Sequence, residues 1–76
     1  MSTAYIEPYD YSTLSKNTRV IVTRSVCFFA KYDIEPVISQ LPRLEKMRIT
    51  VIDHDRHTMK KIIKNNPHIV FEVEYH

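Results

Sequence analysis

The sequence predicts a small α+β protein, a two-layer α/β sandwich in which two short helices cover one face of a three-stranded sheet. Three observations predict it: the β-α-β-α-β order of the hydrophobic patterns, the length of the segments between strands, and the absence of glycine among 76 residues. Two-residue hairpin turns favour glycine. Helix-containing crossovers are therefore expected between the strands, in place of an all-β meander.

Residues 1–17 precede the predicted domain, which spans residues 18–76, and they show no regular hydrophobic period. We expect an irregular N-terminal arm with a short helical turn after Asp10. The arm carries the tyrosines Tyr5, Tyr9 and Tyr11. Because tyrosine rings carry a large apolar area, the arm is expected to lie on a surface, either on its own domain or on a partner protein.

The first predicted strand covers residues 19–30, which are mostly β-branched and aromatic. One alternating set is Val20, Val22, Val26, Phe28 and Ala30, and the other is Ile21, Thr23, Ser25, Cys27 and Phe29. Arg24 interrupts the first set, so a bend or bulge is expected near Arg24 and Ser25. A helix that starts at about Ser25 is the alternative. The single cysteine, Cys27, is expected to be a buried or half-buried small side chain.

Residues 33–41 change to a helical period, with apolar side chains at Ile34, Val37, Ile38 and Leu41. Asp33 is a suitable N-cap, and Pro36 falls in the first turn, where its missing N–H costs little. Pro42 ends the helix.

Residues 47–52 alternate as a second strand, and Asp53 or Asp55 is expected to cap a second helix over residues 56–65. Its apolar stripe is Met59, Ile62 and Ile63. The sequence at 65–67, Asn-Asn-Pro, ends this helix, and asparagine is expected to take a left-handed C-cap conformation.

Residues 68–75 form the final predicted strand, with the clearest alternation in the chain. One face carries Ile69, Phe71, Val73 and Tyr75, and the other carries His68, Val70, Glu72, Glu74 and His76. Because Glu72 and Glu74 need solvent or cations, one face of the sheet is expected to be at least partly open. Arg48 and Thr50 are expected on that face as well. Ile21 and Phe29 would join them if the valine set of the first strand points inward. Parallel and mixed strand directions both fit the pattern.

The missing glycine excludes the common phosphate-binding loops, the α/β-hydrolase elbow and the EF-hand loop. No serine or cysteine lies in a catalytic motif, so we expect a non-enzymatic protein without a cofactor. One cysteine forms no intrachain disulfide, and the longest apolar run has five residues, Val26–Ala30. These features favour an intracellular, cytoplasmic protein that does not cross a membrane.

The sequence at 53–57, Asp-His-Asp-Arg-His, concentrates possible metal ligands after the second strand. Asp55 has a sufficient role as a helix cap, and Asp53 favours the positive end of the helix dipole. A metal site needs three or four ligands that converge in space. The expectation is therefore a capped helix without a metal site.

The second predicted helix carries a basic stripe, formed by Arg56, Lys60, Lys61 and Lys64. Residues 43–64 hold seven basic and three acidic residues, a balance of +4, against +2 for the whole chain. This stripe is suited to phosphates or to an acidic protein surface. Nucleic-acid association is therefore the alternative functional hypothesis.

The leading hypothesis is a small protein-interaction module that binds through its open sheet face, a sheet edge or the N-terminal arm. The expected contact residues are Tyr5, Tyr9, Tyr11, His68, Val70, Glu72 and Glu74. A homodimer is expected, because the sheet has two edges and an uncovered face. Regulatory adaptors and virus-encoded inhibitors of host proteins are often this small, so by analogy of size such a role is expected.

Overall fold

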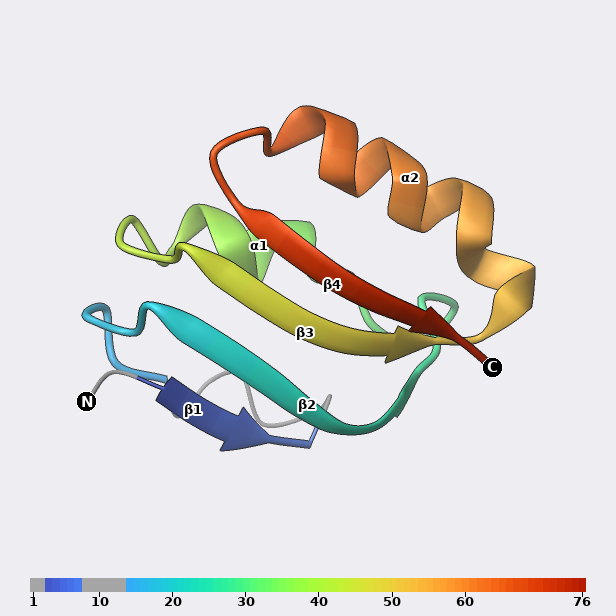
Figure 1. Cartoon of the computed structure of the whole chain (residues 1–76), viewed down its shortest axis with the longest axis horizontal. Helices are drawn as coiled ribbons and strands as arrows, with labels where there is room; N and C mark the ends of the chain where they lie inside the picture. The colour runs from blue at the N-terminus through green and yellow to red at the C-terminus, as the bar shows by residue number, and fades with distance from the viewer. Residues whose placement is uncertain (1–2, 8–13) are drawn as a thin grey trace.

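A computed structural model of the chain shows a single four-stranded sheet with two α-helices (Figure 1). The structure describes residues 3–7 and 14–76. Within them the elements are β1 (Thr3–Ile6), β2 (Val20–Cys27), α1 (Glu35–Ser39), β3 (Lys46–Val51), α2 (Arg56–Asn65) and β4 (Val70–Tyr75). A single 3₁₀ turn, Asp53–Asp55, leads into α2. The strand order is β1-β2-β3-β4, and every neighbouring pair is parallel.

The small α/β class is confirmed, but the prediction of three strands is wrong. The fourth strand, β1, lies in the segment for which the sequence predicts an irregular arm. It pairs with β2 from Thr3 opposite Val20 to Ile6 opposite Thr23. Ile6 is buried, whereas Tyr5 is exposed. The helical turn expected after Asp10, as well as Tyr9 and Tyr11, lies outside the described residues.

Both helices lie on the same side of the sheet, with α1 behind β3 and β4 in Figure 1 and α2 running beside β4. Each crossover from β2 to β3 and from β3 to β4 contains one of them, as the missing glycine predicted. Ile38 of α1 and both Met59 and Ile62 of α2 are buried in the same core as the inward-facing side chains of the strands. The helices therefore cover one face of the sheet.

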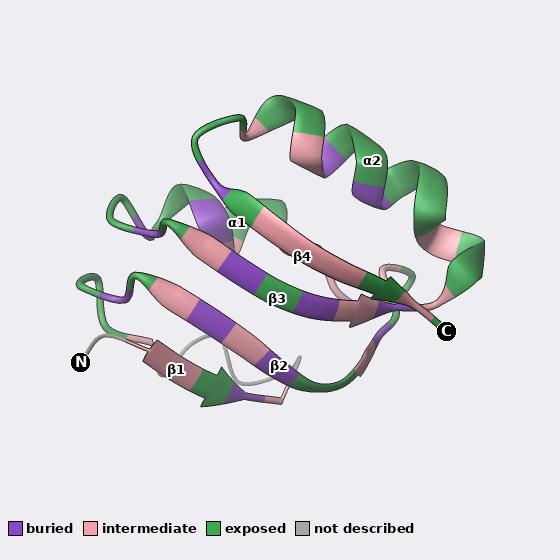
Figure 2. Ribbon diagram, in the orientation of Figure 1, coloured by how far each residue is buried: buried purple, intermediate pink, exposed green. Residues whose placement is uncertain are grey.

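The core lies between this face and the helices (Figure 2). Its fully buried large side chains include Ile21, Ile34, Met47, Ile49 and Met59. Burial of one such side chain contributes about 1.5–3 kcal/mol. On β4, Phe71, Val73 and Tyr75 pack against the core from the edge, as their alternation predicted.

Strand β2 contains the predicted bulge. From Val22 to Val26 it uses four residue steps, whereas β3 uses two between their partners Arg48 and Thr50. Because side chains alternate with a period of two residues, an insertion of two leaves the side chains before and after the bulge on the same faces of the sheet. The strand then ends at Cys27, not at residue 30, and the alternative of a helix from Ser25 is wrong.

The inward set of β2 is the one that contains Ile21 and Cys27, both fully buried. Val22 and Val26 pair with Arg48 and Thr50 on the other face. Phe29, beyond the end of the strand, packs against the core. Ile21 and Phe29 therefore do not contribute to the open face.

The predicted caps act differently from expectation. Helix α1 is shorter than the predicted range of residues 33–41. The Asp33 carboxylate lies two residues before Glu35 and accepts a hydrogen bond from the backbone N–H of Glu35 at 3.1 Å. Asp55 occupies the N-cap position of α2, but its carboxylate accepts the N–H of Phe29 at 2.9 Å. Asp55 thus ties the end of β2 to the start of α2.

The end of α2 also differs from the prediction. Asn66 has φ −130° and ψ 61°, and no described residue has a positive φ, so the left-handed C-cap is wrong. The Asn66 side-chain amide donates instead to the carbonyl of Ile62 at 2.8 Å. This bond satisfies one of the last carbonyls of the helix, which have no partner within the helix.

The position of Cys27 on the buried face of β2 predicts how its thiol reacts. Burial, assisted by the nearby Asp55 carboxylate, raises the pKa of Cys27 to about 11. At pH 8 such a thiol is ionised in about one molecule in a thousand. We expect a thiol reagent to modify folded Cys27 very slowly and to modify it readily in urea. The matched control is Val26→Cys with Cys27→Ala, which moves the thiol to the other face and should react at least about tenfold faster. Equal rates for the unmodified chain and this variant would contradict the placement of Cys27 on the buried face of β2.

Candidate functional site

The sheet face opposite the helices carries three rows of side chains, and none of the described helices covers it (Figure 1). We call it the open face. The first row is Thr3, Val20, Lys46 and Val70; the second is Tyr5, Val22, Arg48 and Glu72; the third is Val26, Thr50 and Glu74. Parallel pairing brings these residues together from four separate parts of the chain.

An uncovered face is unusual for a parallel sheet, because such sheets are normally covered on both faces. Here it leaves apolar side chains in solvent. Tyr5 and Val70 each expose 61% of their surface. An apolar surface of this kind, mixed with polar residues, is typical of a binding site.

The open face divides into two halves of different chemistry. The apolar half lies over β1 and β2 and contains Tyr5, Val20, Val22 and Val26, with Thr3 at its edge. The charged half lies over β3 and β4 and contains Lys46, Arg48, Glu72 and Glu74. Val70 is the apolar member of β4 on this face.

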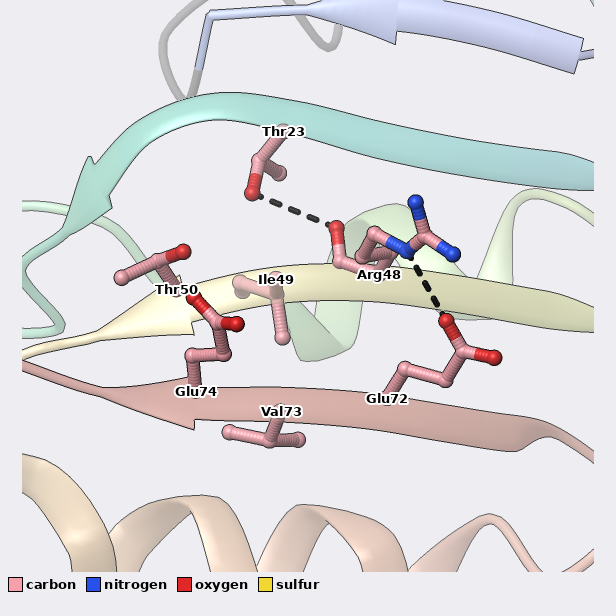
Figure 3. Close-up of a pocket in the computed structure, with 7 residues that line it drawn as sticks. All are labelled: Thr23, Arg48, Ile49, Thr50, Glu72, Val73 and Glu74. Atoms are coloured by element: carbon pink, nitrogen blue, oxygen red, sulfur yellow. Dashed lines mark hydrogen bonds and ion pairs between the residues drawn. The ribbon is translucent and has the colours of Figure 1, made fainter.

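The charges are paired unevenly. Glu72 binds two cations: Lys46 Nζ lies 2.9 Å from its Oε1, and Arg48 Nε lies 2.8 Å from its Oε2 (Figure 3). Hydrogen bonds from Lys46 and then Arg48 lower the pKa of Glu72, and the hydrogen bond to Glu72 raises the pKa of Arg48. For Glu74, the described residues show no hydrogen bond or ion pair.

A hollow of about 430 Å³ lies on the open face beside the bulge of β2 (Figure 3). There the pairing of β2 with β3 is interrupted between Val22 and Val26, and the Thr23 hydroxyl donates to the Arg48 carbonyl at 3.3 Å. Thr50 and Glu74 also line this hollow. Hydroxyls and carboxylates of this kind form hydrogen bonds and ion pairs, and the lining contains no cysteine or histidine.

The structure brings together four of the predicted contact residues. Val70, Glu72 and Glu74 lie on the open face as their alternation predicted, and Tyr5 joins them through β1. His68 is exposed in the turn before β4 and is not part of the strand. The sequence pattern places Lys46 in the connector before the second predicted strand, so the sequence does not predict Lys46 as a site residue. The register of β3 and β4 brings Lys46 beside Glu72.

The predicted basic stripe on α2 is reduced to three residues. Lys60, Lys61 and Lys64 are exposed and have no ion pair among the described residues. Arg56 is already engaged: its Nη2 lies 2.7 Å from Asp53 Oδ1, and its guanidinium lies 4.0 Å from the centre of the Tyr75 ring.

The carboxylates of the segment 53–57 have local partners, since Asp53 binds Arg56 and Asp55 accepts the Phe29 N–H. Across residues 3–7 and 14–76, no three histidine, cysteine, aspartate or glutamate side chains are placed to hold a metal ion. Nor does that part of the chain contain a helix with the length and hydropathy to span a membrane.

In comparisons with known proteins, no family model, no curated protein and no solved structure matches this chain. The function is therefore argued from the open face.

The ion pairs of Glu72 predict a pH dependence of stability. Because the pKa of Glu72 is lowered in the folded protein, its ion pairs stabilise the fold above the ordinary value of 4.5 and lose this effect as the pH falls through the lowered pKa. We expect Glu72→Gln to lower the melting temperature at pH 7, by a small amount because the pairs are exposed.

This difference from the unmodified protein should shrink below pH 4.5 and vanish once Glu72 is protonated. Glu74→Gln is the matched control on the same strand and should have a smaller effect at neutral pH. A Glu72→Gln effect that is the same at acidic and neutral pH would contradict the stabilising role of these ion pairs.

Proposed function

We propose that this chain is a non-enzymatic protein-interaction module that binds another protein through the apolar half of its open face. The observation that carries this proposal is the all-parallel sheet, whose described helices all lie on one side. Parallel strands are stable when both of their faces are covered. A partner surface over β1 and β2 would supply the missing cover.

The composition of the open face supports a protein partner. Tyr5, Val20 and Val22 are neighbours through the pairing of β1 with β2, and Val26 lies on the same face beyond the bulge. Tyrosine is favoured at energetic hot spots of interfaces, because it buries a large area and keeps a polar hydroxyl. The ion pairs over β3 and β4 lie beside these apolar side chains, which matches the usual arrangement of an apolar core and a polar rim.

The polar groups of the open face suit binding better than catalysis. The carboxylate of Glu72 is held by two cations, and Thr23 donates to a backbone carbonyl. Neither arrangement activates a nucleophile. A module of this kind acts by occupying a surface, as a regulatory adaptor or an inhibitor of the protein it binds.

The test compares variants on the two sides of the molecule. The full chain is used to capture a partner from native lysate, and binding to the purified partner is measured by calorimetry. Tyr5→Ser should weaken this binding by at least about 30-fold, the effect of losing about 2 kcal/mol at a hot spot.

Lys60→Ser on α2 is the matched control and should bind like the unmodified chain. Both variants are first checked for unchanged melting temperatures. A captured protein whose affinity is insensitive to Tyr5→Ser but falls with Lys60→Ser would contradict docking on the apolar half.

Nucleic-acid binding is the second candidate function, and the observation that favours it is the row of unpaired lysines on α2. Three phosphate contacts predict that binding weakens by about 40-fold between about 50 and 200 mM salt. Titration of fluorescent single- and double-stranded DNA and RNA measures this. Lys60, Lys61 and Lys64 replaced together by glutamate should abolish the binding. Lack of binding at low salt by the unmodified chain would reject this candidate.

A further inference from the structure

The hollow beside the bulge of β2 has the size of a ligand site. Thr23 of β2 stands on one side of it and Glu74 of β4 on the other, with β3 between them (Figure 3). Ile49 and Val73 contribute their backbones to the lining, because the Ile49 side chain is buried in the core and Val73 packs against it. The volume of about 430 Å³ falls within the range of roughly 300–1,000 Å³ that is usual for ligand sites.

The lining of the hollow carries one negative charge in excess. Its ionisable side chains are one cation, Arg48, and two anions, Glu72 and Glu74. Arg48 turns toward Glu72, to which its Nε donates at 2.8 Å, and away from Glu74 (Figure 3). Lys46, outside the lining, holds the other oxygen of Glu72 at 2.9 Å. Glu74 is exposed and has no ion pair or hydrogen bond within the described residues, so it is the carboxylate of the lining that lacks a cation.

The Thr23 hydroxyl adds a hydrogen-bond acceptor to the hollow. Thr23 is buried, and its hydroxyl donates its hydrogen to the Arg48 carbonyl at 3.3 Å. A hydroxyl whose hydrogen is already donated offers only its lone pairs, and an ionised carboxylate such as that of Glu74 also offers only lone pairs. These two groups therefore suit a ligand that donates hydrogen bonds and carries a positive charge.

The distance between these acceptors determines the shape of the ligand. Thr23 and Glu74 belong to β2 and β4, which are separated by two strand spacings of about 4.8 Å each. A lysine ammonium is a compact charge, whereas an arginine guanidinium is planar and spreads five N–H donors in a fork. A guanidinium placed between the two strands donates to both sides at once. From the hollow, its charge and its acceptors we infer that this site binds an arginine side chain of the partner protein.

This inference rests on the proposed function, because the arginine belongs to the protein that covers the apolar half. The hollow adjoins that half, since Thr50 of its lining pairs with Val26 at the bulge. A surface that lies over β1 and β2 therefore reaches the hollow with one extended side chain. Arginine is among the residues favoured at interface hot spots, and its aliphatic stem packs on apolar side chains such as Val26.

The test titrates the isotope-labelled full chain with N-acetyl-arginine amide and follows its backbone amide resonances by NMR. We expect shift changes at Thr23, Thr50 and Glu74, and none at Lys60 on α2. Because the ion pair is exposed, the dissociation constant should be roughly 1–10 mM and should increase with salt. N-acetyl-citrulline amide has a similar shape without the charge and should bind at least about fivefold more weakly. N-acetyl-lysine amide should bind about threefold more weakly than the arginine derivative.

Three variants assign the binding to the two acceptors. Glu74→Gln should weaken binding of the arginine derivative at least about fivefold. Glu35→Gln removes an exposed carboxylate of α1, on the other side of the sheet, and should bind like the unmodified chain. Thr23→Val removes the second acceptor and should abolish the preference for arginine over lysine. Melting curves confirm that each variant is folded.

Three results would overturn the inference: no shift change at the lining with about 50 mM arginine derivative, equal binding of the citrulline derivative, or full binding by folded Glu74→Gln.

The proposed function fails separately, because the arginine derivative binds without a partner protein. With the purified partner, Glu74→Gln should weaken binding at least about fivefold. A partner whose affinity falls with Tyr5→Ser but not with Glu74→Gln would support the proposed function and overturn the arginine site. A partner that is insensitive to Tyr5→Ser, together with saturable binding of the arginine derivative, would reject docking on the apolar half and retain the hollow as an arginine site.

Discussion

Parallel pairing in chain order is the constraint on which the rest of this structure depends. Each strand must be followed by a connection that returns to the start of the sheet, and consecutive connections that advance in one direction cover the same face. The helices α1 and α2 therefore share one side, where Met47 and Met59 are fully buried. In the described part of the chain, the same constraint leaves the opposite side without a helix, and Tyr5 and Val70 are exposed there.

The bulge in β2 shows how this sheet accepts an irregularity without losing its core. Inserting two residues between Val22 and Val26 changes the path of the strand but not the side on which later residues lie. An insertion of one residue would move Cys27 to the open face and Val26 into the core. The bulge also interrupts the pairing of β2 with β3, and the hollow beside Thr23 and Thr50 lies there.

The sequence predicts those elements whose hydrophobic period is long and one-sided. The period of α2 and the alternation of β4 identify the buried face of each and place Glu72 and Glu74 on the open face. Strand β1 has four residues, too few for an alternation to stand out from chance. In β2 both alternating sets are apolar, so Ile21 and Val22 are equivalent until pairing decides between them. The ion pair of Lys46 with Glu72 and the neighbourhood of Tyr5 and Val22 depend on register, which no local pattern contains.

In the proposed binding of a partner protein, the two halves of the open face contribute different interactions. The two cations of β3 and the two anions of β4 sum to zero, so the charged half exerts little attraction on a partner at a distance. Glu72 and Glu74 stand two residues apart on β4, a distance of about 7 Å, which is close to the screening length of about 8 Å at physiological salt. Charges at this spacing act only when two surfaces are nearly in contact, so in the proposed complex their role is to select the register of docking. Affinity must come from apolar area, which is greatest around Tyr5 and the valines of β2. A surface that combines both discriminates between partners of similar apolar character by where their charges lie.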